Sequence, residues 1–191
     1  MGGIVAFEIA QQLRKEREEV ALLALLDSAV PSSPVHTHPS DDVDFLMWFA
    51  KDLGGGTGKR MALTREDLQN LQLDEQIASV LEQAGEASIL APEMDISYLH
   101  RLIHVFKAHA LALLSYTPYP YPYPAVLLAT EETLAEHACD HSLGWGEFIG
   151  SSLDVHFIPG NHYTMMTESY VQQLAKSLSM CLEKSPGSSL R

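Results

Sequence analysis

The strongest constraint on the fold is an amphipathic helix pattern that leads into a continuous apolar run. Val5, Ile9 and Leu13 recur at helical spacing and predict one apolar stripe. After the charged residues 14–19 comes Val20-Ala-Leu-Leu-Ala-Leu-Leu26, a pattern typical of a strand buried on both faces of a parallel sheet. We therefore expect an α/β fold, with a chain that begins inside an α/β unit.

Two later segments predict further strands of the same sheet. Ala125 to Ala129 is short and apolar, and Leu153 to Ile158 alternates, with Phe157 expected on the apolar side. A final amphipathic helix is predicted from about Thr164 to Leu182, followed by a frayed tail over 183–191. The expected core is therefore three parallel strands with flanking helices.

Residues 41–95, between the first two strands, carry only helical patterns. One helix is expected to stop at Gly54-Gly-Gly56, and a second to begin with the capping residues Thr64 and Asp67. The first of these helices has one apolar face: Val43, Leu46, Phe49, Ala50 and Leu53. Since helical insertions into an α/β pattern commonly cover a site, we expect this one to be a lid.

Composition excludes several classes of function. The chain has 12 Lys+Arg against 25 Asp+Glu, a net charge of −13, whereas nucleic acids are bound largely through Lys and Arg. Two cysteines, Cys139 and Cys181, cannot build a disulfide framework. No apolar run approaches the roughly 20 residues of a membrane span. The N-terminus has no basic segment of the kind that begins a signal peptide. We expect a cytoplasmic protein with neither nucleic-acid nor membrane partners.

Two polar residues follow predicted strands closely. Asp27 comes directly after the first strand, and His162 lies in Pro159-Gly-Asn-His-Tyr163 after the last. Ligands of open α/β sheets bind at the carboxyl ends of the strands, so both residues fall on the functional edge. An aspartate and a histidine there can be the acid and base of a catalytic triad. Taken singly, Asp27 could equally cap a turn, and His162 could be an ordinary loop histidine.

A nucleophile is harder to find. The chain contains no complete Gly-x-Ser-x-Gly elbow, and Gly150-Ser-Ser-Leu-Asp154 lacks the second glycine and precedes a strand. However, Met1-Gly2-Gly3 leads straight into a helix. If a serine preceded Met1, Gly2 would be the last glycine of the elbow, and Gly2 and Gly3 would permit close packing of strand and helix.

Five segments then show a family resemblance in their order and spacing: Met1-Gly-Gly-Ile-Val-Ala-Phe-Glu-Ile-Ala-Gln-Gln-Leu13, Leu26-Asp27-Ser28, Tyr116-Thr-Pro-Tyr-Pro-Tyr121, Leu143-Gly-Trp-Gly146 and Val155-His-Phe-Ile-Pro-Gly-Asn-His162. Together they resemble the thioesterase domains of nonribosomal peptide and polyketide synthases. The resemblance spans nearly the whole chain. It implies the C-terminal part of an α/β-hydrolase fold with a helical lid, so that residues 1–191 would be a thioesterase domain fragment.

The resemblance also implies roles for particular residues. Asp27 matches the triad acid, His162 the general base, and the backbone N–H of Met1 one oxyanion donor. The implied activity is release of an acyl or peptidyl chain from the phosphopantetheine thioester of a carrier protein, by hydrolysis or cyclisation. It implies a carrier protein as partner, and no cofactor or metal of its own. The serine, the second oxyanion donor and the first strands would lie upstream, so we expect residues 1–191 alone to be inactive and poorly stable.

Alternatives remain open at this point. Stand-alone editing thioesterases usually carry the acid after the next strand, where Glu131 and Glu132 stand. The chain could also be a non-catalytic fragment or binding module. Weak metal-binding patterns occur at three places: His100 with His104, His36 with His38, and His137 with Cys139 and His141. The aromatic residues of the expected lid either line an acyl pocket or pack within the lid: Phe45, Trp48 and Phe49.

Overall fold

The computed structural model of this chain describes residues 1–31, 39–91, 93–137 and 139–185. The chain divides into two compact units, residues 1–36 with 113–191 and residues 37–112. We call the first the sheet unit, because it holds the strands, and the second the helical unit.

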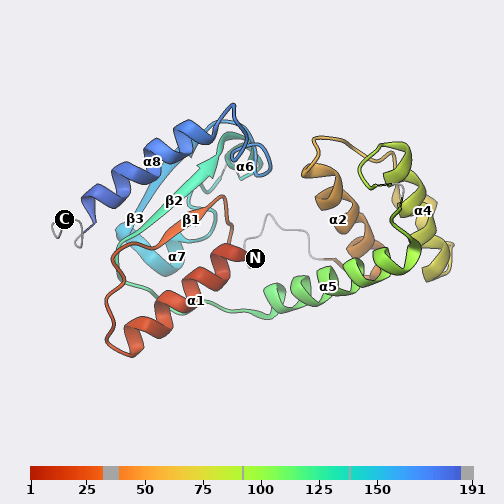
Figure 1. Ribbon diagram of the computed structural model, residues 1–191. Helices are drawn as coiled ribbons and strands as arrows, with labels where there is room; N and C mark the ends of the chain where they lie inside the picture. Colours follow the sequence, from red (N-terminus) through yellow and green to blue (C-terminus); the bar gives the residue numbers. More distant parts are fainter. Residues whose placement is uncertain (32–38, 92, 138, 186–191) are drawn as a thin grey trace. The chain divides into compact units, whose positions relative to one another are not determined.

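A parallel sheet forms the centre of the sheet unit. Strand β1 (Ala24–Leu26) pairs with β2 (Ala125–Thr130), and β2 pairs with β3 (Leu153–Ile158), both in parallel. Helix α8 (Val171–Lys184) covers one face, and α1 (Gly2–Lys15) lies on the other (Figure 1). The unit also contains α6, α7 and a 3₁₀ turn, at Glu131–Glu136, Gly146–Ile149 and Gly150–Ser152. The α/β fold with parallel strands and flanking helices is confirmed.

Helix α1 buries a different face from the one that the sequence predicts. Ile4, Phe7 and Ala10 are buried against the sheet. The predicted stripe of Val5 and its neighbours four residues apart is exposed instead, with Val5 49% and Ile9 52% exposed. The stripe prediction was wrong because this helix is apolar on two faces, and periodicity alone does not say which face meets the sheet.

Two strands differ in detail from their predictions. The run from Val20 to Leu26 forms ladder pairs only over its last three residues, since these have partners on β2. Phe157, expected on the apolar side of β3, is 57% exposed. Among the described strands β3 pairs only with β2 and lies at an edge of the sheet, so alternation along it does not guarantee a covered side chain.

The C-terminal helix begins later than predicted. Residues 164–170 form turns rather than helix. The Asn161 side chain accepts hydrogen bonds from the backbone N–H groups of Tyr163 and Thr164, at 3.1 and 3.0 Å, and so holds a turn there. Helix α8 continues to Lys184, so the tail prediction was wrong for residues 183 and 184, while 186–191 lie outside the described residues.

The helical unit has a core of its own. Its most buried members are Leu46, Leu68, Ile77, Val80 and Leu99. The predicted helix end at Gly54–Gly56 and the capping box of Thr64 and Asp67 are both present. Its helices α2, α3 and α4 span Asp42–Gly55, Arg65–Leu68 and Leu73–Glu86, and α5, at Ile96–Ser115, belongs to it up to residue 112.

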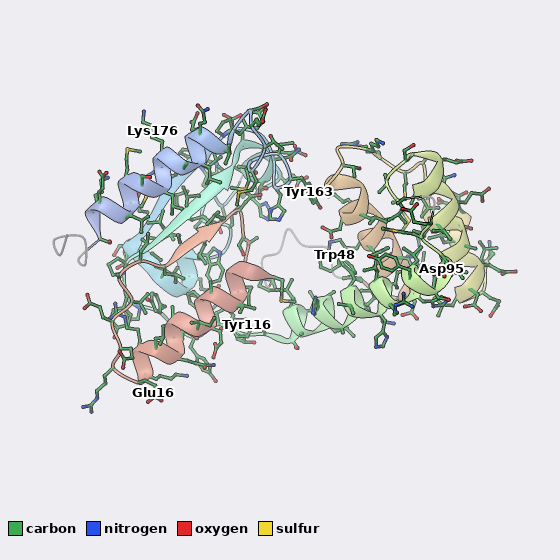
Figure 2. The ribbon with its side chains drawn as sticks, viewed as in Figure 1. Glu16, Trp48, Asp95, Tyr116, Tyr163 and Lys176 are labelled. Atoms are coloured by element: carbon green, nitrogen blue, oxygen red, sulfur yellow. The ribbon has the colours of Figure 1, made fainter. Side chains whose placement is uncertain are left out.

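The aromatic side chains of α2 lie mainly inside this unit. Phe49 is 5% exposed and packs on Phe106, with ring centroids 5.4 Å apart. Trp48 (Figure 2) also meets Phe106 edge-on, at 5.8 Å, but is half-buried. Phe49 is therefore committed to packing. No helix within the described residues is long and apolar enough to cross a membrane.

Candidate active site

The predicted site residues lie where the strands end. Asp27 directly follows β1, Thr130 is the last residue of β2, and His162 comes four residues after the end of β3. Tyr163, the neighbour of His162, lies beyond the sheet in the direction in which the strand arrows point (Figure 2). Parallel pairing thus brings together residues that are far apart in the sequence.

Asp27 and His162 are in direct contact. His162 Nδ1 lies 3.1 Å from Asp27 Oδ2. The Asp27 side chain is fully buried, whereas that of His162 is 58% exposed. A carboxylate at Nδ1 favours the tautomer with the proton on that nitrogen, which leaves Nε2 to accept a proton. The carboxylate thus orients the imidazole and leaves Nε2 free to accept a proton.

Two threonines that the sequence analysis missed complete the surroundings of Asp27. Oδ1 accepts hydrogen bonds from the backbone N–H and the hydroxyl of Thr130, at 2.7 and 3.0 Å. Oδ2 accepts one from the Thr133 hydroxyl, at 2.9 Å. The signal in the sequence was Thr130-Glu-Glu-Thr133, which is a helix-capping pattern as well as a position for a rival acid.

These contacts explain the charges at the site. Burial, the largest influence, raises the pKa of Asp27, but hydrogen bonds from His162, Thr130 and Thr133 together hold this pKa below its ordinary value. The Asp27 carboxylate raises the pKa of His162, against burial and the terminal ammonium of Met1, which lower it. The pair is therefore stabilised with Asp27 ionised.

The pH dependence of this pair gives a first prediction. The pKa of His162 is raised in the folded state. The contact with Asp27 therefore contributes its full stability below about pH 6.5, and this contribution is lost as the pH rises through the raised pKa. The pKa of Asp27 is lowered in the folded state. Its contribution to stability is therefore present above about pH 3.9, the ordinary pKa of an aspartate, and is lost as the pH falls through the lowered pKa. We expect Asp27→Asn to lower the pKa of His162, measured by NMR titration of its ring. An unchanged titration would contradict the charged contact.

The loop after β1 is fixed by the Leu143-Gly-Trp145 motif. Trp145 is fully buried, and its indole N–H donates to the backbone carbonyl of Ser28, at 2.6 Å. The Val30 N–H donates to the carbonyl of Leu143, at 2.9 Å. Asp27 itself has φ 44°, a left-handed conformation that is uncommon outside glycine. The motif therefore holds Asp27 in place through hydrogen bonds to the residues that follow it, Ser28 and Val30, so the role of the motif is structural.

The beginning of α1 packs against Ser28, the residue after Asp27. The Met1 carbonyl accepts the first helical hydrogen bonds, from Ile4 and Val5, and the Met1 ammonium acts on His162. A Cβ on Gly3 would collide with the Ser28 side chain, whereas one on Gly2 would meet nothing within 4 Å. Close packing against Ser28 thus depends on Gly3, while the expectation for Gly2 concerns an upstream strand and stays a prediction.

The rival acids and the metal patterns are placed differently. Glu131 and Glu132 are exposed in the first turn of α6. His100 Nε2 lies 3.1 Å from Asp74 Oδ1 on the helical unit. No group of three or more His, Cys, Asp or Glu side chains in the described parts of the chain is arranged to hold a metal ion. The pattern at His36 and His38 lies outside the described residues.

A parallel sheet with flanking helices and an Asp–His pair at its carboxyl edge is an arrangement that occurs in α/β hydrolases. The profile of the thioesterase domain family matches residues 1–181. The chain therefore belongs to the thioesterase domain family.

Individual relatives agree with this assignment. The chain is 24% identical to the nonribosomal peptide synthetase ucdA of Aspergillus ustus, over 95% of this chain and 20% of the synthetase. It is also similar to holo-AB3403, a four-domain nonribosomal peptide synthetase bound to AMP and glycine, with 28% identity and a TM-score of 0.82 over 94% of this chain and 14% of that one.

The Vlm2 thioesterase domain shares the fold, with 16% identity and a TM-score of 0.58 over 94% of this chain and 62% of that one. The chain thus spans about a fifth of the curated synthetase that it matches and less than two thirds of this solved domain.

Proposed function

We propose that this chain is the C-terminal part of a thioesterase domain that releases an acyl or peptidyl chain from the phosphopantetheine thioester of a carrier protein. The contact between His162 Nδ1 and Asp27 Oδ2, at the carboxyl edge of the sheet, is the observation that carries the proposal. The nucleophile would be a serine directly N-terminal to Met1 in the complete domain. Its position is supported by the close packing of Gly3, near the beginning of α1, against Ser28, the neighbour of Asp27.

The chemistry follows from these positions. The serine Oγ attacks the thioester carbonyl while His162 Nε2 takes its proton, and Asp27 stabilises the imidazolium that forms. The Met1 N–H and a second donor hold the oxyanion. The tetrahedral intermediate collapses, and the pantetheine sulfur leaves with the proton from His162. Water or a nucleophile within the acyl chain, deprotonated by His162, then attacks the ester carbonyl. The serine Oγ leaves with the proton from His162, which restores the serine and releases an acid or a ring.

Two surfaces support a larger domain. Within the described residues β1 pairs only with β2, so its other edge has unpaired backbone groups, which proteins rarely leave open beside a core. The exposed stripe of α1 lies on the same unit: Met1, Val5, Ile9 and Leu13. Upstream strands and a helix of an α/β hydrolase would cover both. The lid role of residues 41–95 belongs to the same proposal.

A serine-directed fluorophosphonate tests the proposal. We expect it to label a chain extended upstream through the Gly-x-Ser sequence, and to leave residues 1–191 unlabelled. Replacing the elbow serine by alanine should abolish labelling of the extended chain, and His162→Ala should slow it severely.

The contrary results are equally clear. An extended chain that folds and stays unlabelled would favour the non-catalytic binding module. Labelling of residues 1–191 that is lost in His162→Ala would place the nucleophile inside this chain, and Ser28→Ala would then test the serine nearest to Asp27.

A further inference from the structure

The end of β2 and the first turn of α6 supply most of the contacts to the Asp27 carboxylate. Of its four hydrogen bonds, three come from Thr130 and Thr133 and one involves His162. We propose that Thr130 and Thr133 are positioning residues that hold this carboxylate in one orientation and share its negative charge with His162. The catalytic meaning of this inference depends on the proposed function; the effect on His162 does not.

The arrangement leaves the carboxylate little freedom to rotate. Among the residues that the structure describes, Thr130 holds Oδ1 through its N–H and its hydroxyl, while Oδ2 lies between the Thr133 hydroxyl and His162. A turn of the carboxylate about its own axis would break all of these bonds at once. The full burial of the Asp27 side chain leaves no water to replace them.

The two threonines are themselves fixed by secondary structure. Thr130 is the last residue of β2 and fully buried, so its N–H is aimed by the strand. Its hydroxyl also accepts from the Thr133 N–H, at 3.3 Å, and lies 3.0 Å from the Thr133 hydroxyl. Thr133 is in the first turn of α6. Branching at Cβ restricts the rotamers of both side chains, so little entropy is lost in holding them.

Sharing of charge has a direction that can be measured. Each donor on Oδ2 withdraws some of the charge that otherwise acts on His162. Without the Thr133 hydroxyl, His162 would be the remaining donor on Oδ2 and would bond more strongly, so the pKa of His162 would rise. The Thr133 hydroxyl therefore keeps the pKa of His162 closer to neutral pH, where a general base works best.

Other charges near His162 must be held constant in such a test. One is the Met1 ammonium, which lowers the pKa of His162. The exposed carboxylates of Glu131 and Glu132 lie in the first turn of α6, which meets the segment before His162 through the bond from the Glu132 N–H to the Gly160 carbonyl, at 3.3 Å. The Tyr163 ring meets His162 edge-on at 5.4 Å and carries no charge at neutral pH. Substitution at position 133 changes none of these groups.

The experiment is an NMR titration of the His162 ring in the 191-residue chain and its variants. Thr133→Val keeps the size and branching of the side chain and removes the hydroxyl. We expect it to raise the pKa of His162 by about half a unit to one unit. Thr133→Ser keeps the hydroxyl and removes only the methyl group, so its titration should match the parent chain. Thr133→Ala replaces the valine variant if that one does not fold.

Two results would overturn the inference. Equal titrations of the parent chain and a folded Thr133→Val chain would mean that the hydroxyl does not share the charge. Equal shifts in the serine and valine variants would assign the effect to packing of the methyl group.

The same variants in the extended chain separate this inference from the proposed function. If Thr133→Val shifts the titration while the extended chain stays unlabelled by fluorophosphonate, the charge sharing stands and the proposed function fails. If the extended chain is labelled and the titration does not move, the proposed function stands and the inference fails. Where the inference and the proposed function both hold, Thr133→Val should lower kcat several-fold at neutral pH with little change in KM. It should also shift the pH–rate profile toward higher pH.

Discussion

Replacing His162 with alanine in the extended chain should lower the rate of acyl release by about 10⁴-fold or more, because no other group would take the proton from the serine. Asp27→Asn should lower it by about 10³- to 10⁴-fold. The amide retains the shape of the carboxylate but loses its charge, and one of its two ends becomes a donor that cannot accept from His162. Hydrolysis of an acyl-pantetheine thioester, followed at substrate saturation, measures both effects.

Matched variants of the rival acids provide the control. Glu131→Gln and Glu132→Gln make the same change from carboxylate to amide on exposed side chains of α6. Each should leave the rate within about two-fold of the parent, because both carboxylates are exposed and water and salt screen their charges. A large loss in a glutamine variant, with Asp27→Asn active, would reverse the assignment and favour the stand-alone subtype.

The sequence predicted the sheet and its polar edge because both depend on local patterns. An apolar run followed by Asp27 fixes the end of a strand, and Pro-Gly-Asn-His162 fixes a turn after another. Parallel pairing then brings the two ends to one edge with no further information. Asp27 and His162 meet at that edge, with His162 Nδ1 3.1 Å from Asp27 Oδ2.

What the sequence did not predict depends on tertiary choices. Helix α1 is apolar on two faces, and only packing decides that Phe7 rather than Val5 is buried. Thr130 and Thr133 were overlooked because a hydroxyl gains its importance from the buried carboxylate beside it, which lies more than 100 residues away in the chain. The sequence pointed instead to Glu131 and Glu132, between the two threonines, because they are charged, although both side chains are exposed.

Trp145→Ala should destabilise the sheet unit more than any other single truncation near the site. Its side chain is fully buried and packs on Phe7, with ring centroids 4.7 Å apart. Truncation of a buried tryptophan costs about 3–5 kcal/mol, against a total stability of roughly 5–15 kcal/mol for a folded domain. Urea unfolding of the 191-residue chain, followed by circular dichroism, should show a greatly lowered midpoint or no cooperative transition.

Trp145→Phe separates packing from the hydrogen bond that fixes the Asp27 loop. Phenylalanine fills most of the same space but leaves the Ser28 carbonyl without the indole N–H that now lies 2.6 Å away. Loss of a buried hydrogen-bond partner costs about 1–3 kcal/mol, so this variant should be intermediate in stability. Because Ser28 is adjacent to Asp27, the loop should also loosen, and the pKa of His162 should fall. A phenylalanine variant as unstable as the alanine one would mean that the hydrogen bond, rather than the buried ring, dominates; an unchanged His162 titration would mean that Trp145 supports the core without positioning Asp27.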